Sequence, residues 1–152
     1  MKKIHKSSEE KPVYNFRRAE EERKLKNYDE AIRFYTKNID IHNGHSTSYF
    51  FRAKCLQDKK LYHRAITDYT KAKNSLHDKY ECLISITICH FNLGRYSMAI
   101  ENCDLAIAQN PQKSIAFYWK GLSFLISKDY RNASFAFIEA KELGCENSAT
   151  PL

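Results

Sequence analysis

The chain has 152 residues, of which 43% are hydrophobic and 28% charged, with only 4 Gly and 3 Pro. This composition is typical of a helical globular protein and argues against both a disordered chain and a strand-rich fold. The formal net charge of +7 lies in the first half: residues 1–80 hold 19 Lys and Arg against 11 Asp and Glu, whereas residues 81–152 hold 6 against 7. A basic half can face an acidic protein, nucleic acid or only solvent, so charge alone does not select a partner.

The spacing of apolar residues predicts eight helices in four pairs, between a basic polar arm at residues 1–11 and a short tail at residues 146–152. The first helix is expected to begin between Ser7 and Pro12, where a capping hydroxyl precedes acidic residues and a proline, and to run to about Lys26. The others are expected at about 28–42, 49–56 and 62–72, 79–92 and 96–109, and 114–127 and 130–143. In the second pair, the hydroxyls of Ser46 and Ser48 are expected to cap the helix that starts at Tyr49.

Three sets of residues repeat through the chain at an interval of 34. They are Tyr28, Tyr62, Tyr96 and Tyr130; Ala31, Ala65, Ala99 and Ala133; and Ala19, Ala53, Thr87 and Gly121. Small residues in register allow helices to approach within about 8 to 10 Å. Four repeats also exceed the roughly three that a stacked core needs. The pattern therefore predicts a helix-turn-helix solenoid, in which each repeat buries its apolar face against its neighbours.

The motif that joins these registers, Tyr-x-x-Ala-Ile, resembles the tetratricopeptide repeat, as do Ala65-Ile-x-x-Tyr69-x-Lys-Ala72 and the closing Asn110-Pro111. The resemblance covers residues 12–145, with repeats at about 12–45, 46–79, 80–113 and 114–147. It implies an all-α, right-handed solenoid of four repeats and eight helices with a concave groove. It also implies that the protein binds other proteins and is not an enzyme.

The resemblance further implies that the first helix of each repeat lines the groove. The candidate partner-binding residues at those places are Phe16, Arg17, Phe50, Phe51, Lys54, Ile84, Ile88, Phe91, Tyr118, Trp119, Leu122 and Leu125. Their polarity changes along the chain, from mixed in the first two repeats to apolar and aromatic in the fourth. We therefore expect the groove to bind an apolar or amphipathic peptide or helix of a partner protein, as an adaptor or chaperone-like scaffold.

Two other uses of the chain are open. The fourth repeat is followed by a tail too short for a capping helix, so its apolar surface is also a candidate for a homodimer or for self-association within a larger assembly. The basic first half, with Tyr49, Phe50 and Phe51 as stacking platforms, is a weaker candidate for binding nucleic acid.

One subtype of the resembling family can be tested on the sequence. Co-chaperones that hold the acidic tails of heat-shock chaperones use a clamp of Lys, Asn and Arg. The matching places here hold Phe16, Glu20, Phe51, Glu81 and Ser85. These side chains cannot make the charge-assisted bonds that a terminal carboxylate needs, so the sequence argues against this partner.

No phosphate-binding loop, carboxylate pair or nucleophile–base motif is visible, so we expect neither catalysis nor a cofactor. His42 and His45 lack further ligands nearby, so we expect no metal site. Five cysteines without a Cys-x-x-Cys pair favour a reducing compartment. The N-terminal residues lack the apolar run of a signal peptide or membrane helix. These features predict a cytoplasmic protein that does not enter a membrane.

Overall fold

The structure is a computed structural model that describes residues 10–42, 45–75 and 78–144. The described residues contain eight α-helices and no strand, as the sequence predicts. The predicted arm, the Asn43-Gly44 segment and the predicted tail lie wholly or largely outside these ranges. The chain divides into two compact halves, residues 1–77 and residues 78–152, each with its own core.

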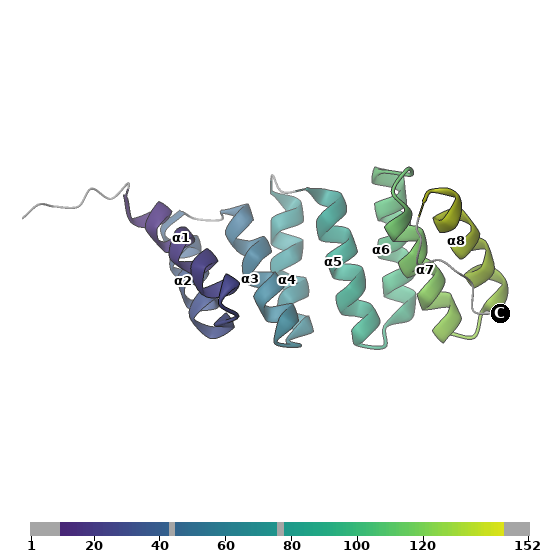
Figure 1. The fold of residues 1–152 in the computed structure, drawn as a ribbon, viewed down its shortest axis with the longest axis horizontal. Coiled ribbons are helices and arrows are strands. Elements are labelled where there is room, and N and C mark those ends of the chain that lie inside the picture. Colours follow the sequence, from purple (N-terminus) through teal and green to yellow (C-terminus); the bar gives the residue numbers. More distant parts are fainter. Residues whose placement is uncertain (1–9, 43–44, 76–77, 145–152) are drawn as a thin grey trace, which may run out of the picture. The chain divides into compact units, whose positions relative to one another are not determined.

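The N-terminal half contains four helices that pair in chain order (Figure 1). They are α1 (Glu10–Lys24), α2 (Tyr28–His42), α3 (Ser46–Asp58) and α4 (Tyr62–Asn74). Ala19, Ala31, Tyr35 and Cys55 are all fully buried in its core. The alanines of the sequence registers thus lie where helices meet, which is the reason that no larger residue occupies them.

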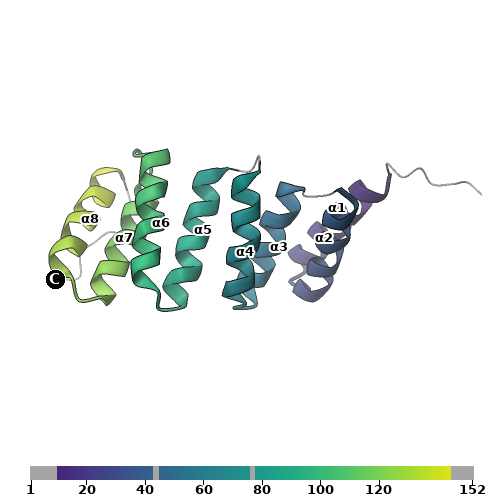
Figure 2. The same cartoon turned by 180° about the vertical axis from the view of Figure 1, so that it is seen from behind.

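The C-terminal half repeats this arrangement, as the view from behind in Figure 2 also shows. Its helices are α5 (Lys79–Asn92), α6 (Tyr96–Gln109), α7 (Ser114–Ile126) and α8 (Tyr130–Glu142). Ala106 of α6 and Ala116 of α7 are fully buried and belong to one cluster with Tyr80, Leu83 and Ile84 of α5. This cluster joins the two repeats of the half and supports the surface described below.

The turn inside each repeat has the same backbone geometry. Lys26, Lys60, Gly94 and Lys128 occupy the left-handed region, with φ between 60° and 71°. The next residue in each turn donates its N–H to the carbonyl oxygen five residues earlier, at 2.8 to 2.9 Å. This bond is typical of a helix that ends at a left-handed residue, which is usually glycine. Three of the four turns nevertheless use lysine.

The prediction that Ser46 and Ser48 cap a helix at Tyr49 is wrong. The helix α3 begins at Ser46, and its cap is His45, whose Nδ1 accepts from the backbone N–H of Ser48 at 3.2 Å. The hydroxyl of Ser48 is buried and accepts from Nδ2 of Asn38 in α2 at 2.8 Å. The Ser48 hydroxyl therefore joins α2 to α3 and does not cap the helix.

Candidate protein-binding face

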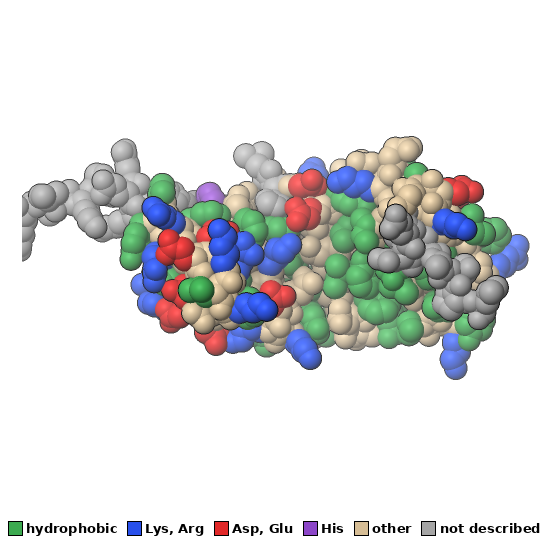
Figure 3. Space-filling model, in the orientation of Figure 1, with side chains coloured by type: hydrophobic (Ala, Val, Ile, Leu, Met, Phe, Trp, Pro, Cys, Tyr) green, Lys and Arg blue, Asp and Glu red, His purple; other side chains and the backbone are tan. Residues whose placement is uncertain are grey.

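The first helices of the two C-terminal repeats, α5 and α7, contact each other through aromatic rings. The ring centroids of Phe91 and Trp119 lie 5.4 Å apart at an interplanar angle of 69°, an edge-to-face contact. Hydrophobic side chains gather over these two helices in Figure 3. We call this surface the apolar face and define it by Ile84, Ile88, Phe91, Ile115, Trp119 and Leu122.

The apolar face rests on the core of the half. Ile88 and Trp119 are partly buried and pack against the cluster of Tyr80, Leu83, Ile84, Ala106 and Ala116. Their side chains are therefore held in place while part of their surface stays accessible. A face fixed in this way loses little conformational entropy when it binds.

The exposure of the residues varies across the face. Ile84 is only 9% exposed and contributes mainly to packing, whereas Ile115 is 37% exposed. Ile88, Phe91, Trp119 and Leu122 lie between these two as half-buried side chains. Tyr118 and Leu125, the other predicted contacts of α7, are also half-buried, and the ring of Tyr118 lies 6.0 Å from that of Phe137 in α8. The ring of Trp119 meets two aromatic rings, those of Phe91 and Tyr118, with centroids 5.4 and 6.1 Å away.

Polar groups border the face at the start of α5. Asp78 caps this helix, its carboxylate accepting from the N–H of Glu81 at 3.1 Å. On the neighbouring loop, Nζ of Lys113 lies 4.3 Å from the ring centroid of Tyr80. The border thus carries both an acidic and a basic side chain, so it favours neither a positively nor a negatively charged partner.

The matching places of the N-terminal half hold a polar network instead. Arg23 donates to the Glu20 carboxylate through Nε at 3.1 Å and Nη2 at 2.8 Å, and the Tyr35 hydroxyl donates to the same group. The Arg23 guanidinium also lies 4.9 Å from the ring centroid of Phe51. These side chains are held by one another, in contrast to the apolar face.

The ionisation of this network follows from its contacts. Burial by itself would raise the pKa of Glu20, but the hydrogen bonds from Arg23 and Tyr35 outweigh it and hold this pKa below its ordinary value. Burial, together with the bond to Glu20, raises the pKa of the Tyr35 hydroxyl. Glu20 is therefore a carboxylate at neutral pH, and Tyr35 is its neutral donor.

The structure distributes the predicted N-terminal contacts unevenly. Phe16 and Phe51 are half-buried, with ring centroids 6.3 Å apart, and both pack against Tyr35. Phe50 is only 2% exposed, with its ring 5.4 Å from that of Tyr69. It lies in the core, where it cannot touch a partner, so we omit it from any binding surface. The adjacent Phe51 is half-buried, and its ring meets that of Phe50 edge to face, with centroids 5.4 Å apart.

The two predicted cationic contacts differ in their surroundings. The side chain of Arg17 is 80% exposed and lies 3.5 Å from Glu21 in an i, i+4 ion pair. Lys54 is half-buried, and its Nζ lies 5.2 Å from the ring centroid of Phe50.

Much of the basic charge in this half is matched by carboxylates. Arg18 bonds Glu21 at 2.8 Å and Glu22 at 3.0 Å. Arg52 makes a two-pronged ion pair with the buried Asp68, at 2.6 and 2.9 Å. The positive electrostatic potential at this surface is therefore weaker than the count of Lys and Arg in the sequence suggests.

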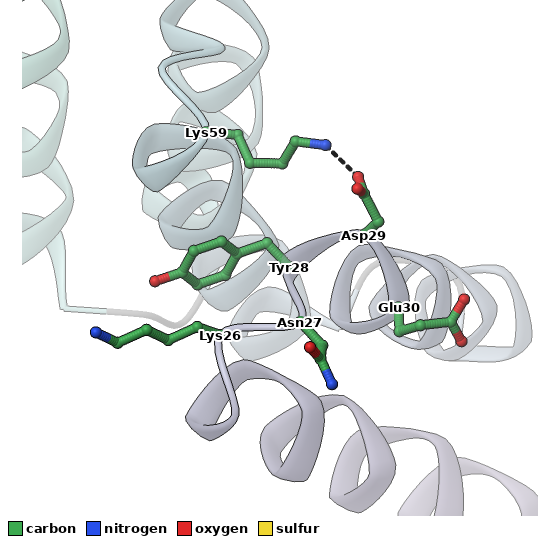
Figure 4. Close-up of a pocket in the computed structure, with 6 residues that line it drawn as sticks. All are labelled: Lys26, Asn27, Tyr28, Asp29, Glu30 and Lys59. Atoms are coloured by element: carbon green, nitrogen blue, oxygen red, sulfur yellow. Dashed lines mark hydrogen bonds and ion pairs between the residues drawn. The ribbon is translucent and has the colours of Figure 1, made fainter.

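A hollow of about 360 Å³ lies at the turn edge of the N-terminal half (Figure 4). Lys59 forms an ion pair with Asp29 across it. The side chains of Lys26, Asn27 and Glu30 point in different directions from that pair and do not converge on one position. A small-molecule site needs convergent polar groups, so this hollow does not resemble one.

Two kinds of feature are absent from the residues that the structure describes. No three His, Cys, Asp or Glu side chains gather there as a metal ion would require. None of these helices combines the length and the apolar character needed to cross a bilayer.

No protein-family model matches the sequence, and no curated protein matches it either. Solved structures, however, resemble the fold. A MamA structure from Desulfovibrio magneticus RS-1 superposes with a TM-score of 0.81 at 16% identity, covering 88% of this chain and 76% of that one. The Arabidopsis OM64 TPR domain gives 0.67 at 24% identity, covering 77% and 97%. The Sgt2 TPR domain from Aspergillus fumigatus gives 0.63 at 23% identity, covering 68% and 71%.

The chain has the tetratricopeptide-repeat fold. In this fold α1, α3, α5 and α7 are the first helices of their repeats, and the apolar face lies on the last two of them. The sequence resemblance placed Phe91 and Trp119 correctly on first helices, and the structure adds that their rings touch. The candidate partner-binding residues did not include Arg23 and Tyr35, because the role of these two side chains depends on their shared contact with Glu20. A tyrosine that lies 15 residues after a glutamate is not a recognisable motif, so the sequence alone could not reveal this contact.

Proposed function

We propose that this protein is a non-enzymatic interaction module, an adaptor or chaperone-like scaffold, that binds an apolar segment of a partner protein on the apolar face of α5 and α7. The observation that carries the proposal is the half-buried pair Phe91 and Trp119, fixed by the core below and accessible above. Aromatic anchors of this kind dominate the energetics of protein interfaces. The fold supports the proposal at the coarser level of a protein-binding scaffold.

The spacing of the face favours a helical partner. Ile84, Ile88 and Phe91 follow one another by four and three residues along α5, and Ile115, Trp119 and Leu122 do the same along α7. Each helix thus presents a ridge of apolar side chains at helical spacing. A partner helix with apolar residues at i, i+3, i+4 and i+7 can pack into such a surface.

The test uses peptide display. A library of amphipathic peptides is selected on the wild-type chain, and the selected peptides are titrated by the fluorescence of Trp119, the one tryptophan of the sequence. We expect peptides with apolar residues at helical spacing and a blue shift of the emission. Ile88→Glu should weaken binding by about tenfold or more, because it places a charge in a desolvated contact.

The control is Leu105→Glu, which places the same charge on α6, at a side chain that is 53% exposed and outside the apolar face. It should leave peptide affinity unchanged. Selected peptides that bind Ile88→Glu as tightly as the wild type would show that the face is not the binding site.

The nucleic-acid alternative draws less support. Phe50, one of its three stacking platforms, is in the core. Tyr49 already lies between two cations, Arg52 at 5.4 Å and Lys71 at 5.1 Å from its ring centroid. We therefore favour a protein partner.

We also propose that the protein resides in the reducing cytoplasm, because its described cysteines are buried free thiols.

A further inference from the structure

The last helix carries an apolar stripe on its solvent side. Arg131, Phe135, Ile138 and Glu142 follow one another by four, three and four residues, the spacing of a coiled-coil seam. All four are exposed, Phe135 by 58% and Ile138 by 48%. The residues that α8 buries, Ala133, Ala136, Phe137 and Ala140, lie on the opposite side of the helix. We call the exposed set the α8 stripe.

The α8 stripe differs from the same surface in every other repeat. Counting back by 34 residues from Phe135 and Ile138 gives Glu101 and Asp104 in α6, Thr67 and Thr70 in α4, and Arg33 and Thr36 in α2. The fold therefore tolerates polar residues at these places and does not require apolar ones. Among the described helices, only α8 exposes two large apolar side chains there.

A following repeat would cover only part of this stripe. At the register position of Ile138, Thr36 of α2 accepts from Arg52 of α3, and Asp104 of α6 pairs with Lys120 of α7. The same side of α2 and α6 carries Ile32 and Ile107, which pack against the clusters that contain Cys55 and Ala116. At the same two register positions α8 has Ser134 and Lys141, both exposed. That side of α8 is therefore polar apart from Ile138. Phe135 lies outside it, at a register position that is exposed in α2, α4 and α6 as well.

We propose that a second copy of this chain covers the α8 stripe, with two α8 helices packed antiparallel about a twofold axis. The stripe is self-complementary in that arrangement. Its centre lies between Phe135 and Ile138, so Phe135 of one copy meets Ile138 of the second copy. Arg131 likewise meets Glu142 of the second copy, at both ends of the seam. A twofold contact of one surface with itself forms a closed dimer.

The charges distinguish this geometry from others. Within one helix, Arg131 and Glu142 are separated by about 16 Å along the axis, given a rise of about 1.5 Å per residue. They cannot pair with each other in the same chain, and they come together only between antiparallel copies. A parallel pairing would place arginine beside arginine and glutamate beside glutamate.

The dimer should be weak, because one helix pair buries less than the roughly 1,200 Å² of a stable complex. Sedimentation equilibrium of the full chain, over about 10 µM to 1 mM, should show a reversible monomer–dimer equilibrium. Ile138→Glu should remain monomeric throughout this range. Leu105→Glu, which adds the same charge to an exposed leucine of α6, should dimerise as the wild type does. A wild-type chain that stays monomeric at the highest concentration overturns the proposal.

Charge reversal tests the antiparallel geometry itself. Arg131→Glu alone and Glu142→Arg alone should each weaken dimerisation by about tenfold, because each creates two like-charge contacts per dimer. The double variant should restore the wild-type dissociation constant. If the double variant is no better than the single ones, or if the mass grows beyond that of a dimer, the two helices do not pack in this way.

This inference is independent of the proposed function. The α8 stripe and the apolar face share no residue, so Ile88→Glu should dimerise normally and Ile138→Glu should still bind the selected peptides. Circular dichroism should show that each variant retains its helical fold. A loss of dimer without a loss of peptide binding therefore concerns the α8 stripe alone.

Discussion

Gly121 of α7 lies against the ring of Phe137 in α8, so closely that a Cβ atom on residue 121 would come within 2.7 Å of Phe137 Cε1. The two residues are 16 apart in sequence, and the same separation relates Ala19 to Tyr35, Ala53 to Tyr69 and Thr87 to Cys103. In the third repeat the second-helix residue is the smaller Cys103 and the first-helix residue is the larger Thr87. Cys103 Sγ lies 3.9 Å from Thr87 Oγ1. In each repeat a small side chain on one helix is thus paired with a side chain on the other helix that fills the remaining space between them.

This relationship predicts the effect of Gly121→Ala. Alanine within a helix is usually more stabilising than glycine, by about 0.5 to 1 kcal/mol. Overpacking a buried ring typically costs about 1 to 3 kcal/mol, and the Phe137 ring is only 5% exposed and has little room to move. We expect a net loss of about 1 kcal/mol in the free energy of unfolding, measured by urea titration.

The matched control is the double variant Gly121→Ala with Phe137→Leu. Leucine lacks the ring atoms that an added methyl group would meet, so the two substitutions together should cost less than the sum of their separate costs. Strictly additive costs would mean that residues 121 and 137 do not compete for one volume.

The repeat fold could be predicted from the sequence, because its signal lies in single positions that recur at a fixed interval. Ala31, Ala65 and Ala99 are each fully buried, as the close approach of helices requires. The volume match between Gly121 and Phe137 could not be predicted so simply. It depends on which residues face each other across two helices, and the sequence registers list those residues separately.

The turn lysines lead to a second prediction. Lys60 and Lys128 have φ of 60° and 65°, a region that costs a residue with a Cβ atom about 1 to 2 kcal/mol and glycine very little. Lys128→Gly should therefore stabilise the chain by about 0.5 to 1 kcal/mol after the greater freedom of glycine in the unfolded state is included. Thermal unfolding followed by circular dichroism measures the change.

Gly94 supplies the reverse experiment in the same half of the chain. It has φ of 71°, and a Cβ atom built on it meets nothing within 4 Å. Gly94→Ala should therefore destabilise through backbone conformation alone. If Lys128→Gly and Gly94→Ala both lower the melting temperature, conformational strain does not control these turns.

The candidate site could be predicted only in part, since resemblance assigns a helix face and not the neighbours of each side chain. Phe50 and Phe51 are adjacent in sequence and were both expected to contact a partner. Their rings touch, but their burial differs: Phe50 packs on Tyr69 in the core, whereas Phe51 stays half-buried beside Phe16. A one-residue step rotates a side chain by about 100° around a helix, which is enough to move it from surface to core.

The Glu20 network predicts a dependence of stability on pH. The pKa of Glu20 is lower in the folded protein than its ordinary value of 4.5, so the folded state binds this proton less tightly than the unfolded state does. The network's contribution is therefore present above about pH 4.5 and is lost as the pH falls through the lower, folded pKa. Urea unfolding at a series of pH values from about 6 to 2 should show this decline.

Glu20→Gln isolates the contribution of the charge. Glutamine retains an acceptor for Arg23 and Tyr35 but does not titrate, so this variant should be less stable than the wild type at pH 6. Its decline toward low pH should also be shallower. If the two unfolding curves run parallel over the whole pH series, Glu20 does not couple proton binding to folding.

Buried thiols give the last prediction. Burial raises the pKa of Cys55, Cys89 and Cys103 to about 12, from an ordinary value of 9.0. Because the thiolate is the reacting species, each should react with a thiol reagent at pH 8 about 1,000-fold more slowly than an exposed cysteine, even before access is considered. Alkylation followed by mass spectrometry should therefore find these three residues unmodified in the folded chain and modified at one common rate once urea unfolds it. Rapid modification of Cys103 in native buffer would mean that the contact between α5 and α6, where Thr87 covers it, opens far more readily than its complete burial implies.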